Sequence, residues 1–196
     1  MMMPDDERPP GAEPDGPEEP EPAFVLVAGV IVYGMMGTAA VLWLWWRDRL
    51  DVLPEQAIGR HGPLLASGAG LAVGLLGAGL LGAAMRRSAA LGEIATTVER
   101  MFARASDATG LAFVLISAIA EELFFRLAVQ DALGLIGSVA FYVLLNSTVG
   151  GVRWILFTVL HALVLGLLVH FGFGLLGSTT AHAILNYLSL RRLQQS

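Results

Sequence analysis

Long apolar segments separated by short polar connections dominate the chain after residue 22. Two of them, 23–46 and 64–85, are clearly long enough to cross a bilayer as helices, since a crossing takes about 20 residues. Four further apolar segments follow at about 109–130, 134–150, 153–172 and 174–190. The pattern therefore predicts an all-α fold: a polytopic membrane helix bundle of about six transmembrane helices.

Two shorter patterns refine this picture. Small residues recur at every fourth position of the second segment, which lets another helix approach closely; they are Gly70, Gly74, Ala78 and Gly82. Apolar side chains also recur at helical spacing from Leu91 to Ala105, with charged residues between them. This spacing is typical of an amphipathic helix in the membrane interface. A connector packed on the bundle would give the same pattern, and both interpretations remain open.

Charge is scarce and unevenly distributed. Charged residues make up 15% of the chain, whereas a soluble domain carries about a quarter, and this favours a lipid environment. Residues 1–22 are acidic and rich in proline, which predicts a disordered tail. Residues 23–106 would hold two transmembrane helices and the interfacial helix, and 107–196 the helix bundle that carries the chemistry. The absence of cysteine excludes disulfides, thiol nucleophiles and Cys-ligated metals.

The arginines predict the orientation of the chain. With six spans, most of them fall on one side of the membrane: Arg86, Arg87, Arg100, Arg104, Arg153, Arg191 and Arg192. Arg47, Arg49 and Arg60 fall on the other. Since arginine is enriched in cytoplasmic loops, both termini are expected in the cytoplasm. We expect an integral protein of a bacterial inner membrane, surrounded by lipid and without a nucleic-acid partner.

The third apolar segment contains three ionisable residues, which are costly inside a membrane and are functional candidates for that reason. Glu122 and Arg126 are four residues apart, share a helical face and can pair. Glu121 points about 100° away from them. Two adjacent carboxylates in a low dielectric cannot both ionise cheaply, so one is expected to hold a proton and to suit general acid or base catalysis. A structural salt bridge would explain Glu122 with Arg126, but not Glu121.

Buried polar residues in the later segments complete the candidate site. His182 and Asn186 share one face of the last segment, His161 lies in the fifth and Asn146 near the end of the fourth. A single histidine there could also be a core residue bonded to a carbonyl. At 1.5 Å per residue, Glu122 lies about 20 Å from one surface and His182 about 12 Å from the other. In a slab of about 30 Å these depths coincide, so the acids and the imidazole can meet.

These residues resemble the motifs of a known family. Glu-Glu-x-x-x-Arg, Phe-x-x-x-His and His-x-x-x-Asn, in this order on hydrophobic helices, resemble the CPBP family of CAAX proteases and bacteriocin-processing proteins, also called Abi. The type II CAAX prenyl endopeptidases belong to it. The resemblance covers about residues 110–190, so the predicted bundle 107–196 would be the CPBP-like catalytic part. The first and third motifs match literally, at Glu121 to Arg126 and at His182 to Asn186.

The second motif departs from the family pattern. His161 satisfies Phe-x-x-x-His literally, with Phe157 before it. Alignment through Arg153-Trp154 and Gly166, which also resemble the family, would instead place Asn146 at the position of the family's histidine. Either His161 has taken over the role, or Asn146 replaces a catalytic histidine.

The resemblance implies an intramembrane endopeptidase. Glu122, coupled to the neighbouring glutamate, would activate a water for attack on a peptide carbonyl. His161 and His182 would bind that water or move its proton, and Asn186 would donate to the oxyanion. Arg126 would orient the glutamate. No cofactor is expected.

Several alternatives remain open from the sequence. Glu122, His161 and His182 could instead ligate zinc, which would lower the pKa of a bound water. The substrate would be a membrane-anchored protein or peptide, such as a peptide precursor or a C-terminal sorting anchor of the kind that the myxosortase branch trims. The same buried residues could relay protons in a transporter. The chain could also be a non-catalytic scaffold or immunity protein.

Overall fold

The computed structural model describes residues 22–87, 105–146 and 151–194. Its elements are α1 (Pro22–Trp46), α2 (Val52–Ile58), α3 (Gly62–Met85), α5 (Asp107–Glu121), η1 (Glu122–Val129), α6 (Gln130–Asn146), α7 (Gly151–His170) and α8 (Gly174–Leu193). No strand occurs within these ranges, which confirms the all-α prediction. The predicted acidic tail and the predicted interfacial helix fall almost entirely outside the described residues.

Within the described residues, three helices are long and apolar enough to cross a membrane: Ala23–Trp46, Gly62–Met85 and Gly151–His170. Large apolar side chains such as Leu64, Leu76 and Leu80 are exposed on their outer faces. A monomer in water rarely exposes contiguous apolar surfaces of this extent. These features identify the chain as a membrane protein.

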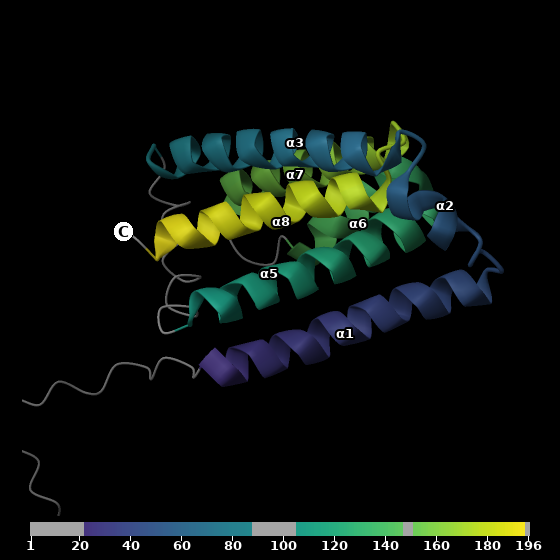
Figure 1. Ribbon diagram of the computed structural model, residues 1–196, viewed down its shortest axis with the longest axis horizontal. Helices are drawn as coiled ribbons and strands as arrows, with labels where there is room; N and C mark the ends of the chain where they lie inside the picture. The colour runs from purple at the N-terminus through teal and green to yellow at the C-terminus, as the bar shows by residue number, and fades with distance from the viewer. Residues whose placement is uncertain (1–21, 88–104, 147–150, 195–196) are drawn as a thin grey trace, which may run out of the picture.

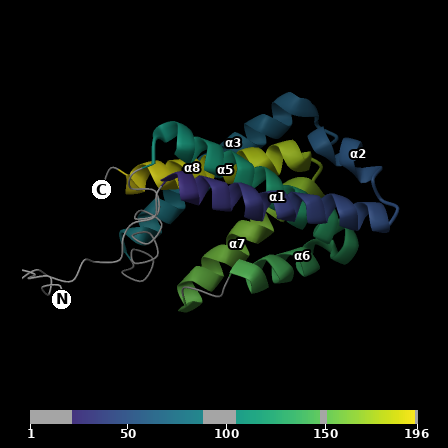
Figure 2. The same ribbon diagram turned by 90° about the horizontal axis from the view of Figure 1, so that it is seen from below.

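The long helices form a row with a helix pair beside it. In the row, α1 packs on α5, α5 on α8 and α8 on α3. Figure 1 shows the four helices in this order from bottom to top. The helices α6 and α7 pack on each other and extend away from this row (Figure 2). The short element η1 contacts α1, α6 and α8, and therefore joins the row to the pair.

The stripe of small residues on α3 is the surface that receives α8, as predicted. Gly70, Gly74, Ala78 and Gly82 are all buried. A Cβ atom added to Gly74 would lie 2.8 Å from the carbonyl oxygen of Ala181 and 2.8 Å from the Cβ of Ile184. The two backbones approach so closely that only glycine fits at position 74.

The helix predicted at about 109–130 is present with nearly those bounds, and the structure describes the segment predicted at 134–150 as far as Asn146. Residues 107–129 form one continuous helical run, since Glu121 and Glu122 both have right-handed helical dihedrals, and at 1.5 Å per residue the run is about 35 Å long. The chain then turns at Gly134, whose φ of 72° favours glycine. The described helix beyond Gly134 is about 18 Å long, which is shorter than a full crossing.

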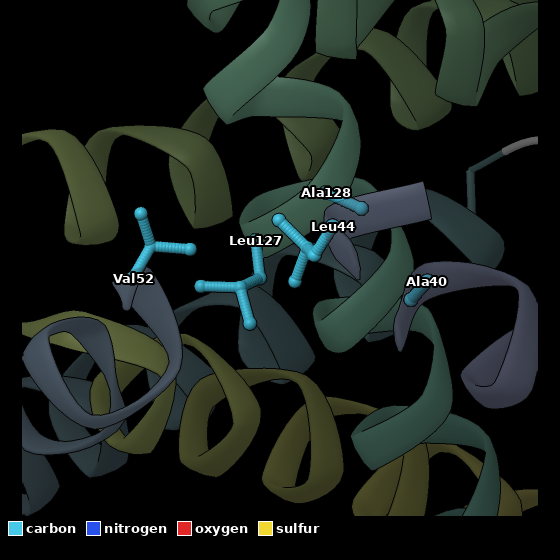
Figure 3. Close-up of a cluster of buried hydrophobic side chains, with 5 residues drawn as sticks. All are labelled: Ala40, Leu44, Val52, Leu127 and Ala128. Atoms are coloured by element: carbon cyan, nitrogen blue, oxygen red, sulfur yellow. The ribbon is translucent and has the colours of Figure 1, made fainter. Parts of the chain in front are cut away.

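One end of the bundle is closed by α2 and by the turn between α7 and α8; we call it the α2 end (Figure 1). An apolar cluster fills its interior, with Ala40 and Leu44 from α1, Val52 from α2, and Leu127 and Ala128 from η1 (Figure 3). At the surface, Arg47 and Arg49 pair with Asp131 at 2.7 and 2.9 Å. These contacts fix η1 against α1 and α2.

Candidate active site

Three buried ionisable side chains form the centre of the candidate site. Glu122 is 0% exposed, and Arg126 and His182 are each 2% exposed. His182 Nδ1 lies 3.0 Å from Glu122 Oε1, and Arg126 Nε lies 3.4 Å from Glu122 Oε2. Both contacts were expected from the sequence, the first from depth and the second from spacing, and both are confirmed. Glu122 therefore faces one positive charge and one imidazole.

Glu121 lies on the more open side of this centre. Its side chain is 13% exposed. The hydroxyl of Tyr142 donates a hydrogen bond to Glu121 Oε2 at 3.2 Å, and His182 Nε2 lies 3.9 Å from the same oxygen. The ring of His182 thus lies between the two carboxylates, with one nitrogen directed to each.

Arg126 is held by partners from α6 as well as by Glu122. Its Nη1 donates to Ser138 Oγ at 3.1 Å, and that hydroxyl donates to the carbonyl of Phe125 at 2.7 Å. The guanidinium lies 5.3 Å from the centre of the Tyr142 ring, within the range of a cation–π contact. Arg126 therefore connects the glutamates to α6.

The structure brings His161, and not Asn146, to the candidate site. The His161 ring lies 4.8 Å from the His182 ring and 5.8 Å from the rings of Tyr142 and Phe157. The Asn146 amide instead donates to the backbone carbonyl of Tyr142 on its own helix, at 2.9 Å. His161 is therefore a second imidazole of the candidate site, in contact with His182.

The remaining candidates lie further from the centre. Asn186 is half-buried, one turn beyond His182 on α8, and its side chain has no hydrogen bond within the part of the chain that the structure describes. An amide in this position can still donate to a bound substrate. His170 is exposed at the last residue of α7, and its ring lies 5.4 Å from that of Phe171.

The helix widens where it carries the glutamates. The eight residues of η1 form a π-helix, and the N–H of Gln130 bonds to the carbonyl of Phe125, five residues back. Such segments are rare and often mark functional sites. At about 4.4 residues per turn, residues four apart stay on almost the same side of the helix. Glu122 and Arg126 therefore lie on one side of η1, in line with Gln130 at the start of α6.

The contributors that the sequence reasoning missed include Tyr142 and Ser138, and also Tyr33 and Ser178, which contact Glu121 and Glu122, respectively. A signal exists for all of these but Tyr33. Ser138, Tyr142 and Asn146 recur at four-residue intervals on an otherwise apolar helix, and Ser178, His182 and Asn186 repeat this spacing on α8. Because a helix has 3.6 residues per turn, each set forms one polar stripe. The two stripes come from the two helices that enclose the glutamates.

The residues suggested as zinc ligands do not form a metal cage in the described chain. No group of three or more histidine, aspartate or glutamate side chains is placed there to hold one ion. The two oxygens of Glu122 face His182 and Arg126. Comparison of the chain with protein-family models, curated proteins and solved structures gave no match.

Proposed function

We propose that the chain is an intramembrane glutamate-dependent endopeptidase of the CPBP type, which hydrolyses a peptide bond of a membrane-anchored protein or peptide without a metal. One observation carries the proposal: the adjacent carboxylates of Glu122, which is buried, and Glu121, which is partly exposed, face the two nitrogens of the His182 ring. A structural salt bridge needs only Glu122 and Arg126. It gives no reason for a second carboxylate and a second imidazole at the same depth.

The proposed membrane arrangement has about six crossing segments, namely α1, α3, the α5–η1 run, α6, α7 and α8. The three long apolar helices and the continuous run over residues 107–129 support it. The short α6 would cross only part of the bilayer. The distribution of arginines favours a bacterial inner membrane with both termini in the cytoplasm.

In the proposed mechanism, Glu121 is the general base. The family resemblance alone would give this role to Glu122. The contacts favour Glu121, because Glu122 is fully buried between His182 and Arg126, whereas Glu121 is partly exposed. Glu122 would act as a positioning residue that holds the His182 ring.

The chemical steps follow from these positions. Glu121 takes a proton from water as the water oxygen attacks the peptide carbonyl, and the C–O bond forms. His182 and His161 hold the attacking water and the developing charges, and Asn186 donates to the oxyanion. The proton then passes to the leaving nitrogen as the C–N bond breaks, which releases the two products.

The direct test is proteolysis by the purified full chain in liposomes, with a library of membrane peptides as substrates. Wild type is compared with Glu121→Gln and His161→Ala, each with and without a chelator. Cleavage that both substitutions abolish and the chelator leaves unchanged supports the proposal. Loss with chelator alone would favour zinc. Absence of cleavage by a stably folded wild type would favour the scaffold or transporter alternatives.

A further inference from the structure

A polar pocket opens beside Arg126. Its volume is about 240 Å³. A water molecule takes about 30 Å³ in the liquid, so the pocket has room for several. It lies at the α2 end, between α2, η1 and the last turn of α7; the lining includes Gln56, Arg126, Gln130, Asp131, Val169 and His170.

Buried polar atoms without partners lie along this pocket. Arg126 Nη2 and Gln130 Oε1 are buried and have no hydrogen bond within the described residues, although Gln130 Nε2 donates to the carbonyl of Gly166 at 3.1 Å. An unpaired donor or acceptor is costly in a low dielectric. A polar space with two or more such partners is the kind that ordered water fills.

The charges around the pocket also suit water better than an ion. Arg47 and Arg49 pair with Asp131, and Arg49 also pairs with Asp51. Arg126 pairs with Glu122. These three positive and three negative charges balance, so no net charge remains to hold an anion. The Arg126 guanidinium at the inner end still repels cations locally. An arginine in this position passes neutral water and hinders protons and metal cations, as in water pores.

A second pocket in the described part of the chain is more apolar, although Tyr33, which contacts Glu121, is among its lining residues. A groove of about 620 Å³ runs between α1 and α5. Its walls are largely apolar, with Val30 and Val41 on one side and Ile116 and Ile119 on the other. In a bilayer, lipid chains would fill a groove of this kind.

We propose that the pocket at the α2 end is the water inlet of the candidate active site. This inference rests on the proposed function. Water enters at Gln56 and His170, passes Gln130 and reaches Arg126. The guanidinium contacts both Glu122 and the Tyr142 ring, and the Tyr142 hydroxyl bonds to Glu121. The hydrolytic water therefore arrives from the α2 end.

The absence of cysteine makes the inlet directly testable, because a single introduced thiol has no background. Val169 lines the pocket, whereas its neighbour Leu168 packs in an apolar cluster. The two side chains are about equally buried, with Val169 8% and Leu168 7% exposed. Val169→Cys and Leu168→Cys are therefore a matched pair. Gln56→Cys, at the pocket rim, is a second reporter if Val169→Cys folds poorly.

The first measurement is labelling of the purified chain in micelles by an anionic methanethiosulfonate reagent, which does not enter an apolar phase. Labelling of Val169→Cys is expected to be about tenfold faster than that of Leu168→Cys, because thiol reactivity follows access to solvent. Equal and slow labelling of Val169→Cys and Gln56→Cys would overturn the inlet. This readout requires no peptidase activity, so it separates the inlet from the proposed function.

The second measurement is hydrolysis before and after labelling. The attached group fills the pocket, so the labelled Val169→Cys protein is expected to lose about tenfold or more in kcat with KM unchanged. Reduction with dithiothreitol should restore the rate, and Leu168→Cys should be unaffected. Full activity after complete labelling of Val169→Cys would show that water enters elsewhere, and would overturn the proposal.

Discussion

His182 Nδ1 and Glu122 Oε1 lie 3.0 Å apart across 60 residues of chain. This contact joins α8 to η1 inside the bundle. It also fixes the rotation of the imidazole, so that the other ring nitrogen faces Glu121. A buried pair of this kind orients a catalytic group in the way that a carboxylate orients the histidine of a hydrolase triad.

Glu121→Gln should abolish hydrolysis and leave folding intact. The amide keeps the shape of the side chain and can still bond to Tyr142, but it cannot accept a proton from water. A lost general base costs about 10²- to 10⁴-fold in rate. Turnover of a membrane peptide and the thermal midpoint Tm are measured together. Retained turnover would move the role of base away from Glu121.

Glu122→Gln should lower stability, which Glu121→Gln should not. Arg126 would keep its buried charge and lose the opposite charge 3.4 Å away. Removing one partner of a buried ion pair costs about 3–5 kcal/mol. Thermal unfolding in micelles measures the effect, with Glu55→Gln on the exposed surface of α2 as the control. Equal Tm values for Glu122→Gln and Glu121→Gln would contradict the structural role of Glu122.

His161→Ala and Asn146→Ala separate the two candidates for the second motif. The His161 ring contacts the His182 ring, while the Asn146 amide bonds to its own helix. We expect His161→Ala to reduce kcat by about 10²-fold or more, and Asn146→Ala to retain most of the activity. The reverse order of activities would favour Asn146.

Tyr142→Phe should reduce kcat and leave KM unchanged. The substitution keeps the ring near Arg126 and removes the hydroxyl that donates to Glu121 at 3.2 Å. Hydrogen bonds to charged groups contribute about 1.5–3 kcal/mol, so a decrease of at least about tenfold is expected. Tyr187→Phe on α8 is the control. A change in KM alone would indicate that Tyr142 contributes to substrate binding and not to the position of Glu121.

Gly74→Ala should destabilise the bundle, whereas Gly79→Ala on the same helix should not. The new methyl group at position 74 would meet the backbone of α8 at 2.8 Å, while nothing lies within 4 Å at position 79. Overpacking costs about 1–3 kcal/mol, and alanine in an open helical position gains up to about 1 kcal/mol. Tm values in micelles compare the two. Similar values would mean that α3 and α8 can separate without cost.

The helical segments, their apolar character and the candidate polar residues were all predictable from residue type and spacing. A run of apolar residues in lipid must satisfy its backbone hydrogen bonds internally, so it becomes a helix whatever its neighbours are. Local spacing likewise fixed the pairing of Glu122 with Arg126 and the small-residue face of α3. Depth along a helix depends only on residue count, which is why the meeting of Glu122 and His182 was predictable.

The difference in burial between Glu122, which is fully buried, and Glu121, which is partly exposed, could be seen only once the helices were packed together. Each residue turns a helix by about 100°, so a partner on another helix depends on how both helices rotate when they pack. The wide turn of η1, the contact of Tyr142 with Glu121 and the choice of His161 over Asn146 all depend on that rotation. The packing of α6 and α7 beside the row sets the rotation of these helices, and the local spacing of residues in the sequence does not specify that rotation.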